Sequence, residues 1–223
     1  MRSSKAQRGA PFRGAIQGRN SSVITAVRSA PSCASSVEET LTFSKPREFT
    51  AWLARHHTKS TGIWVRLAKK DAFPSITYAE ALDCALCHGW IDARKRPESA
   101  VAWLQRFTPR RPRSIWSKRN REKADALIAA GRMLPAGLAE ITRAKQDGRW
   151  DAAYDSPATA TVPPDLAAAL ARNPPAQAFF ETLDSANRYA VLWRVQTARR
   201  AATRAARIAK FVAMLANHEK LHP

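Results

Sequence analysis

The chain has 223 residues, 45% of them apolar, and a formal net charge of +19 at pH 7. A chain of this length forms one large domain or two small ones and buries about 70% of the surface that it exposes when unfolded. It contains no run of about 18 uncharged apolar residues, which excludes a membrane-spanning helix.

Most of the positive charge lies near the two ends. Residues 1–37 carry six Lys or Arg and no acid, and residues 186–223 carry eight against Glu219 alone, so the ends hold +6 and +7 and residues 38–185 hold the remaining +6. Such a balance favours nonspecific binding to polyanions, nucleic acid included. A solvated basic surface is the simpler interpretation, and a nucleic-acid-associated protein is the alternative.

Residues 1–40 differ from the rest in being rich in Ser, Arg, Ala and Gly. They lack the apolar core of a secretory signal peptide, and their low hydrophobicity and high charge predict a disordered basic extension. An organelle transit peptide and a start assigned too far upstream are the alternatives. We expect the protein to be cytoplasmic, with its folded part beginning at about Leu41.

The first predicted elements are a helix and a strand. Ser44 is the expected N-cap of the helix, with Pro46 in its first turn and Phe49, Trp52 and Leu53 at helical spacings. Residues 62–69 alternate in character as a strand does.

A second helix and a hairpin follow. Thr77 and Glu80 form a capping-box pattern at the start of the helix, and Gly89 ends it. Residues 90–94 and 101–107 are typical of strands, and the Pro-containing turn 95–99 between them predicts a hairpin.

Beyond Pro112 the pattern is helical, with Gly and Pro marking the ends of segments. Helices are predicted at 117–130, 136–146, 164–172, 175–184, 188–199 and 202–216. A half that contains a sheet, followed by a helical half, predicts an α+β fold, with an α+β domain over 41–150 and a helical region over 151–223.

Cys84, Cys87 and His88 match the C-x-x-C-H pattern of covalent haem attachment. Haem would require export, and a zinc site would require four ligands, for which no second Cys/His pair is suitably spaced. Cys side chains at i and i+3 of a helix are also too far apart for an unstrained disulfide. We therefore predict reduced thiols, no metal and no cofactor; Cys33 has no evident partner.

Cations, indole rings and short polar side chains are dense around the predicted hairpin. Guanidinium groups can hold carboxylate or phosphate with two hydrogen bonds, and Trp offers a stacking face, so this composition suits a small anionic ligand. Ser117 is also a candidate N-cap. The alternative is an Arg–Asp and Trp packing network. The candidate ligand-binding residues are Lys69, Lys70, Trp90, Asp92, Arg94, Arg110, Arg113, Trp116, Ser117, Lys118 and Asn120.

Motifs of common enzymes are absent from the sequence: it has no G-x-S-x-G, P-loop, G-x-G-x-x-G or H-E-x-x-H. No catalytic residue is assigned. An enzyme of unrecognised chemistry would draw on His88, Asp92 and Arg110.

Several blocks of sequence resemble the YdeI/OmpD-associated family, also called bacteriocin-protection proteins. They are residues 85–92, 106–120, 131–137, 144–150, 162–166, 178–180 and 203–208. His88 stands where the family has an aromatic residue, and Ala201-Ala202 replaces a break that contains Pro. The resemblance implies a bacterial protein linked to tolerance of antimicrobial peptides and to envelope stress, with a stress protein as a partner and no assigned reaction. A non-catalytic binding protein is therefore our leading hypothesis.

Overall fold

The computed structural model describes residues 39–223. Cys33 and nearly all of the predicted extension 1–40 lie outside the described residues. No helix in the described part is long and apolar enough to cross a membrane.

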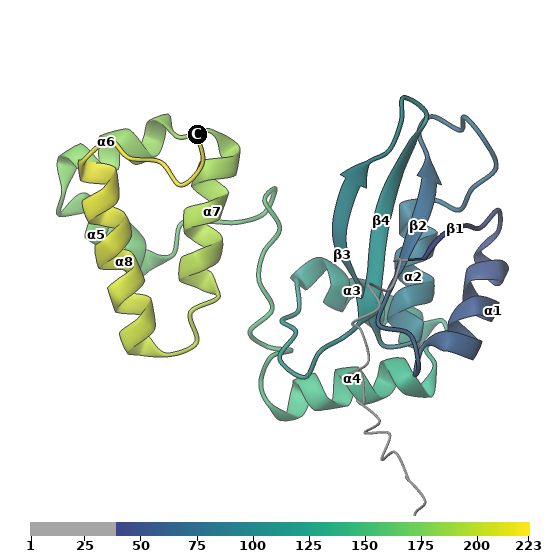
Figure 1. Cartoon of the computed structure of the whole chain (residues 1–223). Coiled ribbons are helices and arrows are strands. Elements are labelled where there is room, and N and C mark those ends of the chain that lie inside the picture. The colour runs from purple at the N-terminus through teal and green to yellow at the C-terminus, as the bar shows by residue number, and fades with distance from the viewer. Residues whose placement is uncertain (1–38) are drawn as a thin grey trace, which may run out of the picture. The chain divides into compact units, whose positions relative to one another are not determined.

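The elements follow one another as a sheet-containing part and then a run of helices (Figure 1). This is the α+β arrangement that the sequence predicts. In chain order they are β1 (Thr40–Thr42), α1 (Pro46–His56), β2 (Ile63–Ala68), α2 (Tyr78–Cys87), β3 (Trp90–Pro97), β4 (Ala102–Pro109), α3 (Lys118–Ala129), α4 (Pro135–Gln146), α5 (Pro164–Ala171), α6 (Pro174–Thr182), α7 (Ser185–Gln196) and α8 (Ala201–Ala216).

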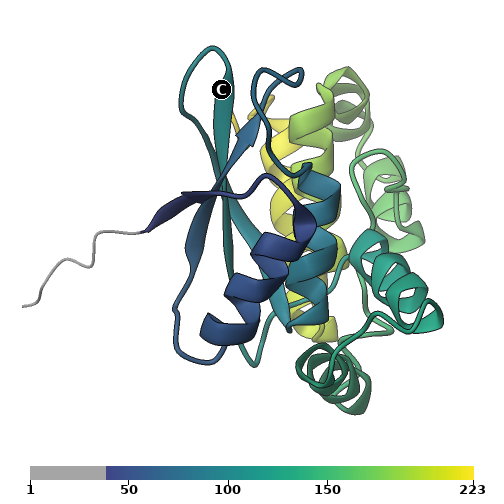
Figure 2. The same cartoon turned by 90° about the vertical axis from the view of Figure 1, so that its right-hand side faces the viewer.

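The four strands form one sheet in the order β1-β2-β4-β3. β1 pairs with β2 in parallel, and the other neighbours are antiparallel. The β3–β4 hairpin has a register shift between Asp92 and Lys95. Helices α1 and α2 lie against one face of this sheet (Figure 2).

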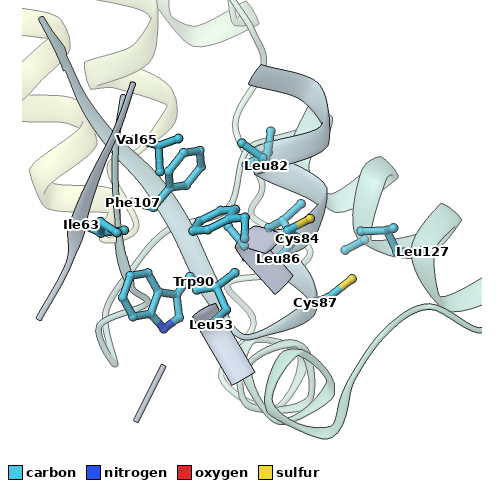
Figure 3. Close-up of a cluster of buried hydrophobic side chains, with 14 of the residues drawn as sticks. Leu53, Ile63, Val65, Leu82, Cys84, Leu86, Cys87, Trp90, Phe107 and Leu127 are labelled. Atoms are coloured by element: carbon cyan, nitrogen blue, oxygen red, sulfur yellow. The ribbon is translucent and has the colours of Figure 1, made fainter. Parts of the chain in front are cut away.

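Apolar side chains from α1, α2, α3 and the sheet meet in one core (Figure 3). Phe49 of α1 packs against Phe107 of β4, with ring centroids 5.6 Å apart. Trp90 is almost fully buried, and its indole N–H donates to the His57 carbonyl at 3.1 Å. A second apolar cluster is built from residues of α5–α8 and the turn after α6, between Leu166 and Leu215.

Capping residues and glycines in the sequence explain where most of the helices begin and end. The Thr77–Glu80 capping box is present, because the Thr77 hydroxyl accepts from the Glu80 amide and the Glu80 carboxylate accepts from the Thr77 amide. Gly89 ends α2 with φ +72°, a conformation that favours glycine. The start of α1 differs by one residue from the prediction: Lys45 is the N-cap, and the Ser44 amide donates to the Glu48 carboxylate.

The structure differs from the predicted elements in three other places. The short strand β1 was not predicted, since three residues carry too little alternation. β3 extends to Pro97 and thus covers part of the predicted 95–99 turn. α7 begins at Ser185 rather than at residue 188, because Asp184 caps it by accepting from the Asn187 amide at 2.8 Å.

Candidate anion-binding site

Side chains alternate between the two faces of a strand, so the residues of the predicted cluster do not all lie on the same face of the sheet. Asp92 pairs with Phe107, whose side chain belongs to the core between sheet and helices, and Asp92 accepts a hydrogen bond from the Tyr78 hydroxyl at 2.8 Å. Trp90 is two residues away and lies in the same core. Both side chains therefore contribute to packing on the helix-covered side.

Arg110 follows β4 directly and is anchored on both sides. Its amide donates to the Gly89 carbonyl at 3.0 Å, and its guanidinium carbon lies 3.5 Å from the centroid of the Trp116 ring. Trp116 is itself buried and packs edge-on against Trp150 at 4.8 Å. Stacking on a held ring fixes the plane of the guanidinium group.

The Nε/Nη2 edge of this guanidinium makes no hydrogen bond to a described residue. Nη1 of Arg110 makes a long contact of 3.4 Å with the Ile115 carbonyl, whereas Nε and Nη2 have no hydrogen-bond partner among the described residues. Elsewhere, Arg66 uses the same edge to bind Glu98, with Nε and Nη2 at 2.7 and 2.6 Å from the two carboxylate oxygens. The Nε/Nη2 edge of Arg110 is the edge with which a guanidinium binds a carboxylate or phosphate, and both of its nitrogens are buried.

Burial raises the free-energy cost of leaving these N–H groups without a hydrogen bond. Arg110 is only 6% exposed, and burial lowers its pKa to about 10, while Glu140 and Asp92 act in the opposite direction. A guanidinium with a pKa of about 10 is still charged at neutral pH. A buried cation with unsatisfied N–H groups is costly, so an anion bound there would be favoured.

Arg110 lines a pocket of about 690 Å³ at the end of the sheet. Small-molecule sites commonly have volumes of about 300–1,000 Å³. Among the described residues, four arginines and no carboxylate line the wall. The lining residues are Thr61, Trp64, Ile91, Ala93, Arg94, Arg106, Thr108, Pro109, Arg110, Arg111, Pro112 and Ser114.

Of the predicted ligand-binding residues, Arg94 and Arg110 line this pocket, and the Trp116 ring stacks on the Arg110 guanidinium. Sequence reasoning missed Trp64, Arg106 and Arg111. Trp64 and Arg106 are register partners on neighbouring strands, so the alternation of β2 and β4 could have placed them on one face.

The remaining predicted residues have other positions. Ser117 is the N-cap of α3 and accepts from the Asn120 amide at 3.2 Å, as expected for a cap. Lys118 pairs with Asp155 at 2.6 Å, and Lys69 donates to the Ser99 carbonyl at 2.7 Å. Lys70 is exposed in the turn after β2, and Arg113 is exposed and does not line the pocket.

The Cys84-x-x-Cys87-His88 motif is buried at the end of α2. The Cys84 thiol accepts from the Thr50 hydroxyl at 3.3 Å, and burial raises the pKa of both thiols, that of Cys87 to about 11. His88 Nδ1 lies 2.8 Å from the Cys84 carbonyl. Both cysteines are free, and the described residues contain no group of three or more metal-ligating side chains.

Two family models match parts of the chain. Residues 41–140 match a domain of unknown function (DUF8412), and residues 159–218 match the family described as bacteriocin-protection, YdeI or OmpD-associated. Neither the comparison with curated proteins nor that with solved structures gave a match. The blocks between residues 85 and 150, on which the resemblance also rested, lie outside the second match. Over the C-terminal helices the resemblance agrees with the second match: residues 159–218 are similar to the YdeI/OmpD-associated family.

Proposed function

We propose that this protein is a non-catalytic binding protein whose α+β part holds a small anion against Arg110. The observation that carries the proposal is the buried guanidinium of Arg110, whose Nε and Nη2 have no hydrogen-bond partner among the described residues, in a residue that borders a pocket lined by arginines. The stack on Trp116 orients this edge before a ligand arrives, which lowers the entropic cost of binding.

The cellular role that we propose is tolerance of antimicrobial peptides or bacteriocins in the cytoplasm of a bacterium. The description of the family that matches residues 159–218 supports this role. The free, buried thiols are consistent with a reducing compartment. The anion would then be a signal or metabolite that the protein binds during stress.

A calorimetric titration of the full chain with inorganic phosphate tests the binding site. Arg110→Lys keeps the charge but removes the two-pronged edge, so the affinity should fall about tenfold or more, the equivalent of about 1.4 kcal/mol. Arg113→Ala is the matched control, since Arg113 is an exposed arginine outside the pocket, and its affinity should equal that of the wild type.

The unfolding midpoint of each variant without ligand separates binding from packing. If Arg110 were part of a packing network with Asp92 and Glu140, Arg110→Lys would lower this midpoint and leave the phosphate affinity unchanged. That result would refute the proposed site. Survival of bacteria that express either Arg110→Lys or the wild type, challenged with a cationic peptide, tests the cellular role separately.

A further inference from the structure

A groove runs between α5 and α8 in the helical part of the chain. The two helices pack side by side (Figure 1), and the groove has a volume of about 710 Å³. Alanine is the commonest residue along it, and none of its residues belongs to the pocket at Arg110. The lining residues are Asp165, Ala169, Arg172, Asn173, Ala201, Arg204, Ala205, Ile208, Ala209, Val212 and Ala213.

Small side chains keep this groove open along α8. Ala201, Ala205, Ala209 and Ala213 recur at every fourth position, so they lie on one face of the helix, and all four are exposed. At a rise of about 1.5 Å per residue they span about 18 Å, which is the length of about three helical turns. Side chains of this size allow a second helix axis to approach to about 8 Å. The groove therefore has room for one short helix.

The polar side chains at the groove leave no hydrogen-bonding partners for an extended peptide backbone. Nε and Nη2 of Arg204 donate to the two carboxylate oxygens of Asp165 at 2.5 and 2.8 Å, and the Asn173 side chain accepts from the Ala176 amide at 3.1 Å as the N-cap of α6. The backbone groups along α5 and α8 are used within those helices. A strand lying here would leave its own N–H and C=O groups without partners, whereas an α-helix satisfies them internally.

The charge that remains at the groove is positive. Asp165 is matched by Arg204, so neither of these residues attracts a partner. Arg172 is exposed and makes no ion pair with a described residue, and the same is true of Lys210, which follows Ala209 in α8. Acidic side chains beside the apolar face of a partner helix would be attracted to these two cations, and basic ones would be repelled.

From these observations we infer that the α5/α8 groove is the docking site for an amphipathic α-helix of a partner protein. The apolar face of that helix lies on the alanines of α8, and acidic residues flank this face and meet Arg172 and Lys210. The inference concerns a different surface from the anion site proposed at Arg110 and does not depend on it.

Two helical peptides of about 14 residues are the probes. Both have Leu at positions i, i+3, i+4 and i+7, and the flanking positions are Glu in one peptide and Lys in the other. A covalent staple keeps each peptide helical, because peptides of this length are marginal helices in water. Fluorescence anisotropy with the full chain at about 50 mM salt should show the Glu peptide binding about tenfold or more tightly than the Lys peptide. The difference should shrink at about 0.5 M salt.

Variants of the groove separate its shape from its charge. Ala209→Gln places a longer, polar side chain among the alanines and should weaken the Glu peptide about tenfold or more. Ala178→Gln makes the same change at an exposed position of α6 outside the groove and should leave the affinity unchanged. Arg172→Glu reverses one charge, so it should weaken the Glu peptide and strengthen the Lys peptide.

Three results would overturn the inference. Equal affinities for the Glu and Lys peptides at low salt would rule out an acidic partner. Absence of binding, or binding that Ala209→Gln leaves unchanged, would show that a helix does not dock in this groove. Sedimentation of the chain alone should show a monomer, and a dimer that Ala209→Gln dissociates would mean that a second copy of the chain covers the groove instead.

Discussion

At the scale of single residues, Arg110 is a buried cation whose hydrogen-bonding groups are only partly used by the described residues. A guanidinium removed from water is costly unless opposite charge and hydrogen bonds compensate it. Trp116 covers one face of the group and the Ile115 carbonyl meets one nitrogen, but two N–H groups remain. An oxyanion would supply both the charge and the two acceptors.

The composition of the sequence pointed to only some of the residues of the proposed site. Arg110 and Trp116 were predicted because cations and indole rings are dense after the hairpin. Trp90 and Asp92 belong to the same dense stretch, yet strand pleating directs them to the helix-covered side. Composition shows which residues are close together in the chain. Which of their side chains come into contact depends on the face of the strand to which each one points.

His88 gives a prediction about pH. It is 4% exposed, and burial lowers its pKa below the ordinary value. Between pH 7 and 5 the unfolded chain, with a His pKa of about 6.5, takes up the proton before the folded chain does, so stability should fall as the pH falls. His57, whose ring centroid lies 5.6 Å from that of His88, adds to the effect.

Urea unfolding at a series of pH values measures this slope. His88→Gln can still donate to the Cys84 carbonyl and does not titrate, so it should flatten the slope between pH 7 and 5. His222→Gln changes an exposed histidine and should leave the slope as it is. An unchanged slope in His88→Gln would show that His88 does not carry the effect. The carboxylates with lowered pKa, such as Asp155 and Asp165, contribute at lower pH.

At the scale of elements, most helices and both strands of the hairpin could be predicted from periodicity, caps and breakers. The box at Thr77 and the turns at Gly89, Gly131 and Gly148, each with positive φ, are local signals. The order of the strands and the parallel pairing of β1 with β2 come from tertiary contacts. No local pattern records them, which is why β1 was missed.

Gly137 shows tertiary packing overriding helix propensity. It is buried in the first turn of α4, where a Cβ atom would lie 2.6 Å from the Leu86 carbonyl oxygen and 2.8 Å from that of Cys87. Propensity alone predicts that Gly137→Ala stabilises a helix by about 0.5–1 kcal/mol. Because backbone oxygens at the end of α2 block the methyl group, we expect destabilisation of about 1–3 kcal/mol instead.

Ala139→Gly, at an exposed position in the same helix, is the matched control. It should cost about 0.5–1 kcal/mol, the propensity term alone. Denaturant unfolding measures both variants. A Gly137→Ala protein more stable than the wild type would show that α4 can move away from α2.

At the scale of the whole molecule, the net charge of +19 has two separate consequences. The arginines around Arg110 line one pocket, whereas the surplus near the ends, +6 on residues 1–37 and +7 on residues 186–223, is expected to act on any polyanion. The terminal surplus predicts weak, salt-sensitive DNA binding without sequence preference.

Deletion of residues 1–37 removes six cations and no acid. The logarithm of the DNA affinity should fall with the logarithm of salt with a slope of about −0.9 per phosphate neutralised, and the deletion should make that slope shallower. Fluorescence anisotropy over a salt series measures it. Tight binding of one DNA sequence by the truncated chain at about 150 mM salt would favour the nucleic-acid alternative instead. Phosphate affinity at Arg110 should be the same in both chains, because no described lining residue is deleted.

Whether Arg110 holds an oxyanion through Nε and Nη2, as we propose, is tested most directly by a crystal structure of the protein grown with inorganic phosphate. We expect the phosphate ion at Arg110, with two of its oxygens about 2.7–2.9 Å from Nε and Nη2 and the guanidinium still stacked on Trp116. A structure in which that edge of Arg110 instead binds Asp92 or Glu140, with no phosphate density in the pocket, would contradict the claim.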